Sequence, residues 1–326
     1  MQNIRLNTAA EVLAAIPALL GFAPTDSLVM IALSGADGEP GMLAFVARTD
    51  VVGAAPTDQY RIAFEQAEAT AVIWVVVGTG PVAAAALDQI EGAQRELDTI
   101  GVRTIRTLVT ETLQVGSPWF DTNGNESGHT TDPTLSETNM HRIMSGRKAP
   151  TTRADIEARF TEDTAADMDA ARAAAHEQGD EFARNTIAEI AATVRNFEVP
   201  SRDLAARAGL CAAMDTNHRE AMIGIVTISA AAATDTFATI AAHLRGNFRV
   251  QILTLAGLAA YVDGDGPAAG IAFETARRID VDPSLTKLLE LLDSSLTVGI
   301  KPEAIAELGA IGVEVARSIG IDLDTE

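Results

Sequence analysis

The stretch from Pro17 to Val29, which reads PALLGFAPTDSLV, constrains the fold of this chain more than any other. Gly21 and Pro24 predict that a helix ends there, because glycine takes left-handed backbone angles without steric penalty and proline cannot continue a helix. Asp26–Ser27 predicts a turn, and the apolar run 28–33 predicts a buried strand. This pattern predicts a helix, a turn and a strand, and it indicates no particular reaction.

The residues around this stretch predict a mixed sheet flanked by helices. Thr8 and Glu11 have the spacing of a capping box, which starts the first helix. The strands 28–33 and 42–47, joined by a Gly-rich run, predict an antiparallel hairpin. Residues 72–77 are apolar at every position, as in a central strand covered on both faces. Further elements are predicted as helices over 58–69 and 81–99 and a strand over 102–115.

The rest of the chain divides into an irregular segment and a helical region. Over 116–152 Gly, Ser, Asn, Asp, Thr and Pro predominate, which predicts a long irregular loop with a functional or linking role. Helices are expected over 155–160, 164–196, 201–214, 219–244, 250–261, 267–279, 284–296 and 302–319. We therefore expect a mixed α/β domain over 1–150, ending in the irregular loop, and an all-α helical domain over 151–326.

One helical hairpin carries more detail. Gly264 and Gly266 predict its turn, and Ala269, Phe273 and Ala276 lie on its second helix. The hairpin resembles a tetratricopeptide-type helix pair, in which small residues let two helices approach closely. No second copy follows, so the resemblance implies one helix pair and no superhelical array.

Composition limits the classes of partner. The 326 residues carry a formal net charge of −21, and 47% are hydrophobic although only 4% are aromatic. An acidic chain repels the phosphates of nucleic acid and the headgroups of anionic lipid, so we expect binding to neither. No uninterrupted apolar run of about 18 residues occurs, which predicts a soluble chain outside the membrane. We expect it in the cytoplasm of a bacterium, or of the host cell if a phage encodes it.

Residue types for metal or redox chemistry are sparse. Cys211 is the single cysteine and lies in an alanine-rich helical run, so we expect a small buried hydrophobe and no disulfide. The segment 121–132 is rich in side-chain oxygens, but Glu126 and Asp132 stand where a calcium loop needs Gly and Glu. The histidines lack the accompanying thiols of a zinc site. We expect neither a metal nor a cofactor.

The run Gly78–Ala83 follows an apolar strand and opens a helix in the G-x-G-x-x-A pattern of a dinucleotide loop. Gly78, Thr79 and Gly80 are therefore candidates for binding a phosphate. However, Pro81 removes a backbone donor where such a loop needs one, and no acidic residue follows at the usual distance of about 20 residues. We favour a tight turn between strand and helix as the reason for the glycines.

The one dense cationic cluster lies between the two expected domains. Its members are Arg142, Arg147, Lys148, Arg153 and Arg159. Arg142, Arg147 and Arg153, with Trp119, are candidates for binding a small anionic ligand. We favour the alternative, in which the cluster docks the two domains by pairing with carboxylates early in the helical region. Those carboxylates are Glu162, Asp163, Asp167 and Asp169. Trp119 either covers a pocket or holds the loop in place.

The pattern Leu-Leu-Gly-Phe-x-Pro-x-x-Ser-Leu-Val at residues 19–29 resembles the signature of domain-of-unknown-function family 4192, found in actinobacteria and their phages. The capped first helix, Trp119 after the last strand, Gly146 before a Thr-Arg pair and the segment 261–292 are similar as well. The resemblance covers most of the chain and implies architecture and lineage but no activity. Many relatives carry cysteines between that Trp and that Gly, whereas residues 120–133 here contain none.

No catalytic motif emerges from the sequence. A G-x-S-x-G elbow, an H-E-x-x-H pair and a Walker pattern are missing, although an enzyme whose residues converge only in space stays open. We expect a non-catalytic binding or assembly protein, phage-encoded or actinobacterial, that associates with itself or with a protein partner. The alternative is a small-molecule or nucleotide-binding protein, or an enzyme, with its site at the strand ends and the interdomain junction. A third possibility, an acidic mimic that blocks a DNA-binding protein, requires carboxylates aligned along one face.

Overall fold

The computed structural model describes residues 8–35, 41–51, 57–124, 126–144 and 152–323. The chain divides into two compact units. One comprises residues 1–153 with 297–299, and the other comprises residues 154–296 with 300–326. We call them the sheet unit and the helical unit.

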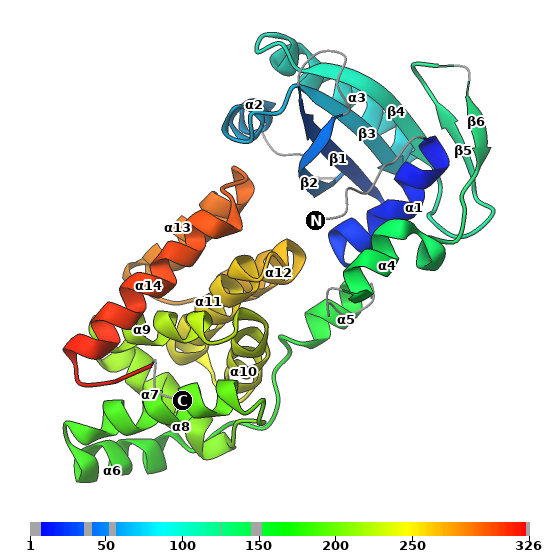
Figure 1. Cartoon of the computed structure of the whole chain (residues 1–326). Coiled ribbons are helices and arrows are strands. Elements are labelled where there is room, and N and C mark those ends of the chain that lie inside the picture. Colours follow the sequence, from blue (N-terminus) through cyan, green and yellow to red (C-terminus); the bar gives the residue numbers. More distant parts are fainter. Residues whose placement is uncertain (1–7, 36–40, 52–56, 125, 145–151, 324–326) are drawn as a thin grey trace. The chain divides into compact units, whose positions relative to one another are not determined.

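The sheet unit is built on a six-stranded mixed sheet with the order β2-β1-β3-β4-β5-β6 (Figure 1). Its strands are β1 (Ser27–Ser34), β2 (Met42–Asp50), β3 (Ala71–Val77), β4 (Arg103–Thr110), β5 (Pro118–Asp121) and β6 (Ser127–His129). β3 and β4 run parallel, and the other neighbouring strands are antiparallel. The predicted mixed sheet and its β1–β2 hairpin are therefore confirmed.

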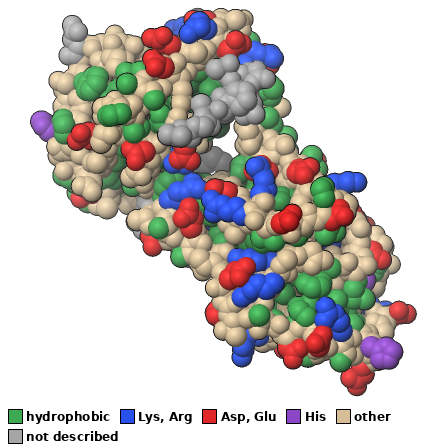
Figure 2. Space-filling model, turned by 180° about the vertical axis from the view of Figure 1, so that it is seen from behind, with side chains coloured by type: hydrophobic (Ala, Val, Ile, Leu, Met, Phe, Trp, Pro, Cys, Tyr) green, Lys and Arg blue, Asp and Glu red, His purple; other side chains and the backbone are tan. Residues whose placement is uncertain are grey.

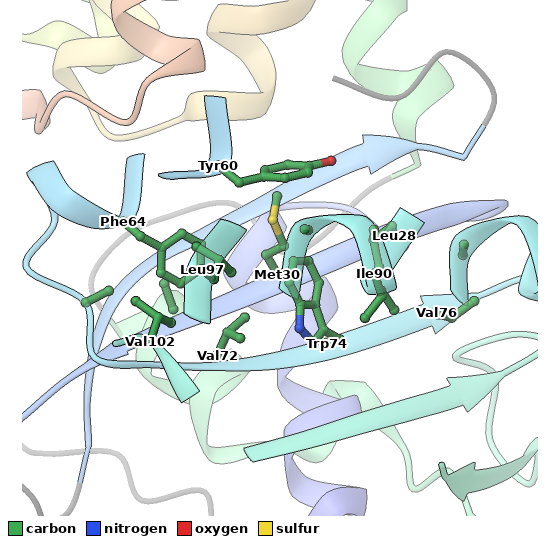
Figure 3. Close-up of a cluster of buried hydrophobic side chains, with 14 of the residues drawn as sticks. Leu28, Met30, Tyr60, Phe64, Val72, Trp74, Val76, Ile90, Leu97 and Val102 are labelled. Carbon is green, nitrogen blue, oxygen red and sulfur yellow. The ribbon is translucent and has the colours of Figure 1, made fainter. Parts of the chain in front are cut away.

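Helices cover the sheet and supply the core of this unit. They are α1 (Ala9–Leu20), α2 (Thr57–Gln66), α3 (Gly80–Asp98), η1 (Pro133–Leu135) and α4 (Glu137–Met144). Side chains of α2 and α3, among them Tyr60, Phe64 and Ile90, pack against alternate residues of β1 and β3 (Figure 3). Trp74 is completely buried at the centre of this cluster. Every residue of β3 is buried, which confirms the predicted central strand.

The ends of α1 lie where the sequence predicts them. The Thr8 hydroxyl accepts a hydrogen bond from the Glu11 backbone N–H at 3.2 Å, and the Glu11 carboxylate accepts one from the Thr8 backbone N–H at 3.1 Å. At the other end Gly21 has φ 78°, a left-handed conformation that terminates the helix. The chain then turns and enters β1 at Ser27.

The prediction of an irregular loop over 116–152 is wrong. β5, β6, η1 and α4 all fall within that range, and the predicted strand 102–115 ends at Thr110 so that the chain can return as β5. β5 pairs with β4, and β6 pairs with β5. Such short strands are stabilised by their pairing partners and carry little local periodicity, which explains the error. Residues 145–151 lie outside the described residues.

The helical unit follows, and it confirms that helices make up the second half of the chain. Its elements are α5 (Arg153–Ala158), α6 (Met168–Gln178), α7 (Glu181–Arg195), α8 (Arg202–Met214), α9 (Thr216–Ile223), η2 (Gly224–Thr227), α10 (Ala230–Ala242), α11 (Gly246–Val262), α12 (Gly266–Arg277), η3 (Pro283–Leu285), α13 (Lys287–Thr297) and α14 (Pro302–Ser318). In the described part of the chain, no helix combines the length and apolarity needed to cross a bilayer.

Two helices predicted as continuous are interrupted. The one predicted over 164–196 divides at Gly179, whose φ of 55° ends α6 before α7 begins. The one predicted over 219–244 divides into α9, η2 and α10, because the Ser229 hydroxyl accepts a hydrogen bond from the Ala232 N–H and starts a new helix. The first break is made at Gly179, and the second spans η2 and Ser229.

Small residues allow the helices of this unit to pack very closely. The predicted hairpin of α11 and α12 is confirmed, and a Cβ at Gly257 of α11 would lie 2.2 Å from the Phe273 ring of α12. Gly312 of α14 meets η2 in the same way, because a Cβ there would lie 2.3 Å from the Gly224 nitrogen. A methyl group at either position would force the two elements apart.

We predict that Gly257→Ala lowers the free energy of unfolding by about 2 kcal/mol, because the added methyl group overlaps a fully buried ring. Gly270→Ala in α12 is the matched control, since its Cβ would meet Leu296 at an ordinary 3.7 Å. That change should be neutral, or raise stability by up to about 1 kcal/mol through helix propensity. Chemical denaturation followed by far-ultraviolet circular dichroism measures both. Equal losses in the two variants would contradict the close packing.

Candidate functional site

The stretch 17–29 leads to the end of the sheet at which the carboxyl termini of β3 and β4 lie. Ser27, the first residue of β1, lies opposite Val77 at the end of antiparallel β3. The Gly78 N–H donates to the carbonyl of Thr110, the last residue of β4, at 2.9 Å. The Asp26 carboxylate lies 3.2 Å from the position of a Cβ on Gly78. Open α/β folds bind ligands at the carboxyl ends of their strands, so this end of the sheet is a candidate site.

The Gly78 loop is closed by neighbouring side chains. A Cβ on Gly78 would lie 2.6 Å from Val82 Cγ1, so packing against Val82 requires the glycine. At Gly80 an added Cβ would meet nothing within 4 Å, and the Thr79 side chain makes no capping hydrogen bond to α3. Asp26 brings a negative charge to the loop, which disfavours a phosphate there. The geometry favours the tight turn over a phosphate loop.

Hydroxyl groups at this end of the sheet are engaged in local hydrogen bonds. The Thr110 hydroxyl lies 2.8 and 3.0 Å from the carbonyl oxygens of Thr112 and Pro118, either of which can accept its single proton. The Thr112 and Ser117 hydroxyls share a hydrogen bond of 2.5 Å, and Arg48 donates to the Ser27 hydroxyl at 2.8 Å. Across the described residues, no three His, Cys, Asp or Glu side chains converge as a metal site would need. These hydroxyls hold the backbone in place and form no catalytic arrangement.

Trp119 lies on β5 and is only 7% exposed. Its partner across the hairpin is Gly128 of β6, and a Cβ on Gly128 would lie 2.9 Å from the indole ring. The ring therefore occupies the space that the glycine leaves. Of the two roles expected for Trp119, this position favours holding the β5–β6 hairpin over covering a pocket.

The members of the cationic cluster have different partners. Arg142 on α4 donates to the carbonyl of Ala18 in the last turn of α1 at 3.1 Å. Its guanidinium lies 3.2 Å from the position of a Cβ on Gly21, so the missing side chain makes room for it. Arg153 begins α5 and is half-buried, whereas Arg147 and Lys148 lie outside the described residues. Binding of an anionic ligand by these residues stays a prediction.

Arg159, the last member of the cluster, belongs to the helical unit. It forms ion pairs with Asp235 at 2.8 Å and Asp265 at 3.5 Å. Both carboxylates are absent from the set that we expected as partners of the cluster. The sequence therefore identified Arg159 as an ion-pairing residue but not its partners.

The four carboxylates expected to dock the domains have partners inside the helical unit. Glu162 forms ion pairs with Arg245 at 2.9 Å and Arg249 at 3.5 Å. Asp163 and Asp167 accept hydrogen bonds from nearby backbone N–H groups, and Asp169 pairs with Arg172 on its own helix at 2.6 Å. Docking of the domains by the cationic cluster stays a hypothesis.

The oxygen-rich segment 121–132 also serves local structure. Buried Asp121 accepts hydrogen bonds from the backbone N–H groups of Thr107 and Asn123 at 3.3 and 3.0 Å. A hydrogen bond from Arg106 lowers the pKa of Glu126 from its ordinary value. Asp132 caps η1 through the Thr134 N–H. These carboxylates fix the β5–β6 hairpin and the chain that follows it.

Sequence reasoning missed the most unusual element of the sheet unit, which is α4. Its side chains Thr138 and Asn139 are buried, whereas Met140, Ile143 and Met144 are 52%, 51% and 83% exposed. The helix thus turns polar side chains inward and apolar ones outward, the reverse of a normal surface helix. The i, i+3, i+4 spacing of the three apolar residues was the available signal, and the polar residues around them concealed it.

Charged side chains are mixed on the face drawn in Figure 2. Acidic and basic groups alternate over the helical part of that face, without an acid-only stripe. This face therefore gives no support to mimicry of DNA, which requires aligned carboxylates.

Comparison with known proteins yields a family and no further relative. The family described as "Domain of unknown function (DUF4192)" matches residues 10–303. No curated protein and no solved structure matches. The family description names no activity.

We predict that Gly78→Ala lowers the free energy of unfolding by about 1–3 kcal/mol, because its methyl group would overlap Val82. Gly80→Ala should leave stability unchanged within about 0.5 kcal/mol, since the space beside it is open. Thermal unfolding of both variants, with and without added nucleotide, tests the tight-turn interpretation. If nucleotide raises the melting temperature of the native protein but not that of Gly80→Ala, the loop binds phosphate and the tight-turn interpretation is wrong.

Cys211 provides a test of burial in the helical unit. Burial raises the pKa of its thiol to about 12, so that only about one molecule in 10⁴ carries a thiolate at pH 8. We predict that a disulfide reagent such as dithionitrobenzoate modifies Cys211 only after unfolding in denaturant. Release of one equivalent of chromophore from the native protein within minutes would contradict a buried thiol.

Proposed function

We propose that this chain, which belongs to the DUF4192 family, is a non-catalytic binding protein that assembles with a second copy of itself through the outer face of α4. We define this outer face as Met140, Ile143 and Met144, extended by Leu135 of η1. The single observation that carries the proposal is the reversed orientation of α4. The support for it comes from the inner side of the helix, its outer side and the charge of the chain.

The inner side of α4 is held by polar contacts. Arg142 donates to the Ala18 carbonyl, at the end of α1 where the helix dipole favours a cation. The Asn139 amide donates to the Thr134 carbonyl at 2.9 Å, and its backbone N–H donates to the Ser136 hydroxyl at 3.2 Å. Rotating α4 to bury its apolar residues would break the Arg142 contact with α1. The outward position of the methionines is therefore fixed by specific hydrogen bonds.

The outer side of α4 offers apolar area to a partner. Met140 and Ile143 are half exposed, Met144 is 83% exposed and Leu135 is 74% exposed. Completing the burial of the three α4 side chains would contribute about 4 kcal/mol per copy. Two copies contribute about 8 kcal/mol, against an association cost of about 4–15 kcal/mol. A two-fold contact of this kind predicts a weak, concentration-dependent dimer.

The charge of the chain decides how such a dimer responds to salt. Each copy carries a formal net charge of −21, so two copies repel one another over long distances. Salt screens that repulsion and leaves the apolar contact intact. Association through α4 should therefore strengthen as the salt concentration rises, whereas an association held by ion pairs would weaken.

The competing function, a small-molecule or nucleotide site or enzyme at the strand ends and interdomain junction, has less support. The Gly78 loop at the strand ends is occupied by Val82 and faces a carboxylate. An actinobacterial or phage origin and a place in the cytoplasm belong to the proposal as well. The resemblance of residues 19–29 supports the former, and a chain with one cysteine fits a reducing compartment.

We predict that the weight-average mass of the native protein rises towards that of a dimer between about 1 and 300 μM in analytical ultracentrifugation, and more steeply in high salt. Met144→Glu should weaken association at least about 10-fold, because it places a charge in the contact. Val199→Glu is the matched control, since Val199 is 85% exposed but lies in the helical unit. A monomer at every concentration, or equal effects of the two variants, would contradict the proposal.

A further inference from the structure

The helical unit contains a cavity of about 440 Å³, a volume within the range of small-molecule sites. One wall includes Ile271 and Thr275 of α12, and Ile279 just beyond the end of that helix. The chain around the end of α5, including Phe160, also lines the cavity. Arg249, from the first turns of α11, completes the lining. All of these residues belong to the helical unit, so the cavity is defined within it.

Arg249 is the unusual member of this lining because it is only 2% exposed. Its terminal nitrogens donate to the backbone carbonyls of Ala241 and Phe160, and its Nε lies 3.5 Å from the Glu162 carboxylate. A guanidinium carries five N–H donors. Among the described residues, these three acceptors are its hydrogen-bonding and ion-pairing partners. Two donors, one on each terminal nitrogen, are left for another acceptor.

The charge of Arg249 is also incompletely balanced. Glu162 is half exposed and lies closer to Arg245, at 2.9 Å, than to Arg249. One carboxylate therefore serves two guanidinium groups. Burial lowers the pKa of Arg249 from its ordinary value, Glu162 raises it, and the neighbouring Arg245 lowers it. A buried cation with a shared counter-charge is favourable for binding an anion that enters the cavity.

The other lining residues determine which hydrocarbon body and how many charges a ligand can have. Phe160, Ile271 and Ile279 provide apolar surface suited to a branched hydrocarbon. The other charged residues are Glu157, Glu274 and Arg278, of which Glu274 and Arg278 are paired with each other. Their carboxylates discourage a ligand with several negative charges, such as a nucleotide. A single carboxylate on an aliphatic body fits both parts of the lining.

We propose that this cavity binds a small aliphatic carboxylate, whose oxygens accept the two remaining Arg249 donors while its hydrocarbon body lies against Phe160, Ile271 and Ile279. The site is separate from the outer face of α4 and does not depend on self-association. The same carboxylate chemistry occurs in a simple branched acid and in a zwitterionic amino acid, whose ammonium group would lie near the glutamates. The affinity expected for so small a ligand is on the order of 1 mM.

Three probes with the same branched hydrocarbon body test the proposal on the full-length protein by saturation-transfer NMR titration. They are 4-methylpentanoate, which has the carboxylate alone, leucine, which has both groups, and 3-methylbutylamine, which has the ammonium alone. We expect saturable binding of at least one carboxylate probe and at least about 10-fold weaker binding of the amine. Tighter binding of 4-methylpentanoate identifies a simple acid, and tighter binding of leucine identifies a zwitterion.

Two variants locate the binding. Arg249→Met should weaken it at least about 10-fold, but it also removes hydrogen bonds to two carbonyls and can disturb folding. Thr275→Phe avoids that difficulty, because it fills the cavity and leaves Arg249 intact. Its control is Thr239→Phe on α10, which makes the same hydrogen bond to a carbonyl four residues earlier but does not line the cavity.

Binding lost in Thr275→Phe and retained in Thr239→Phe would support the site. The proposal is overturned if neither carboxylate probe binds saturably below about 20 mM, if the amine binds as tightly, or if Thr275→Phe binds like the native protein. Each of these results is independent of whether the protein forms dimers, so failure here leaves the proposed function standing.

Discussion

The hydrogen bond from Arg142 to the Ala18 carbonyl joins α4 to α1 and orients α4 in the sheet unit. It joins residues 124 positions apart and places a cation at the carbonyl end of α1, where the chain itself supplies no basic residue in the last turn. Gly21 makes the contact possible, since a side chain there would crowd the guanidinium. With Arg142 turned inward, helical geometry requires Met140, Ile143 and Met144 to point outward. The stretch that ends α1 thus also sets the orientation of α4.

A different constraint shapes the helical unit. With only 4% aromatic residues, the chain cannot fill its interior with large rings, and it relies on short distances between small side chains. Gly257 against Phe273 and Gly312 against Gly224 are the closest examples. Where the packing includes a charge, as at Arg249, backbone carbonyls satisfy part of its donors. The cavity beside Arg249 is lined by side chains of this unit, including Phe160 and Ile271.

Local signals explain what the sequence could predict, and distant pairing explains what it could not. The capping box at Thr8, the stop at Gly21 and the apolar run of β3 each depend on neighbouring residues, and the structure confirms all three. β5 and β6 depend on β4, and therefore looked irregular. At the candidate site, Pro81 already argued against a phosphate loop, but the approach of Asp26 to Gly78 follows from the β1–β3 register. The contact of Arg142 with the Ala18 carbonyl could not be predicted either, because the two residues lie far apart in the sequence.

We propose that the outer face of α4 is a contact surface and that hydrogen bonds on the inner side of the helix set its orientation. Hydrogen–deuterium exchange of the segment 137–144, measured over a range of protein concentrations, tests this most directly, because protection of a helix rises when a partner covers it. We expect exchange in this segment to slow as the protein concentration increases, while exchange in α11 stays constant. Exchange in 137–144 that is independent of concentration, or protection that appears only elsewhere, would contradict it.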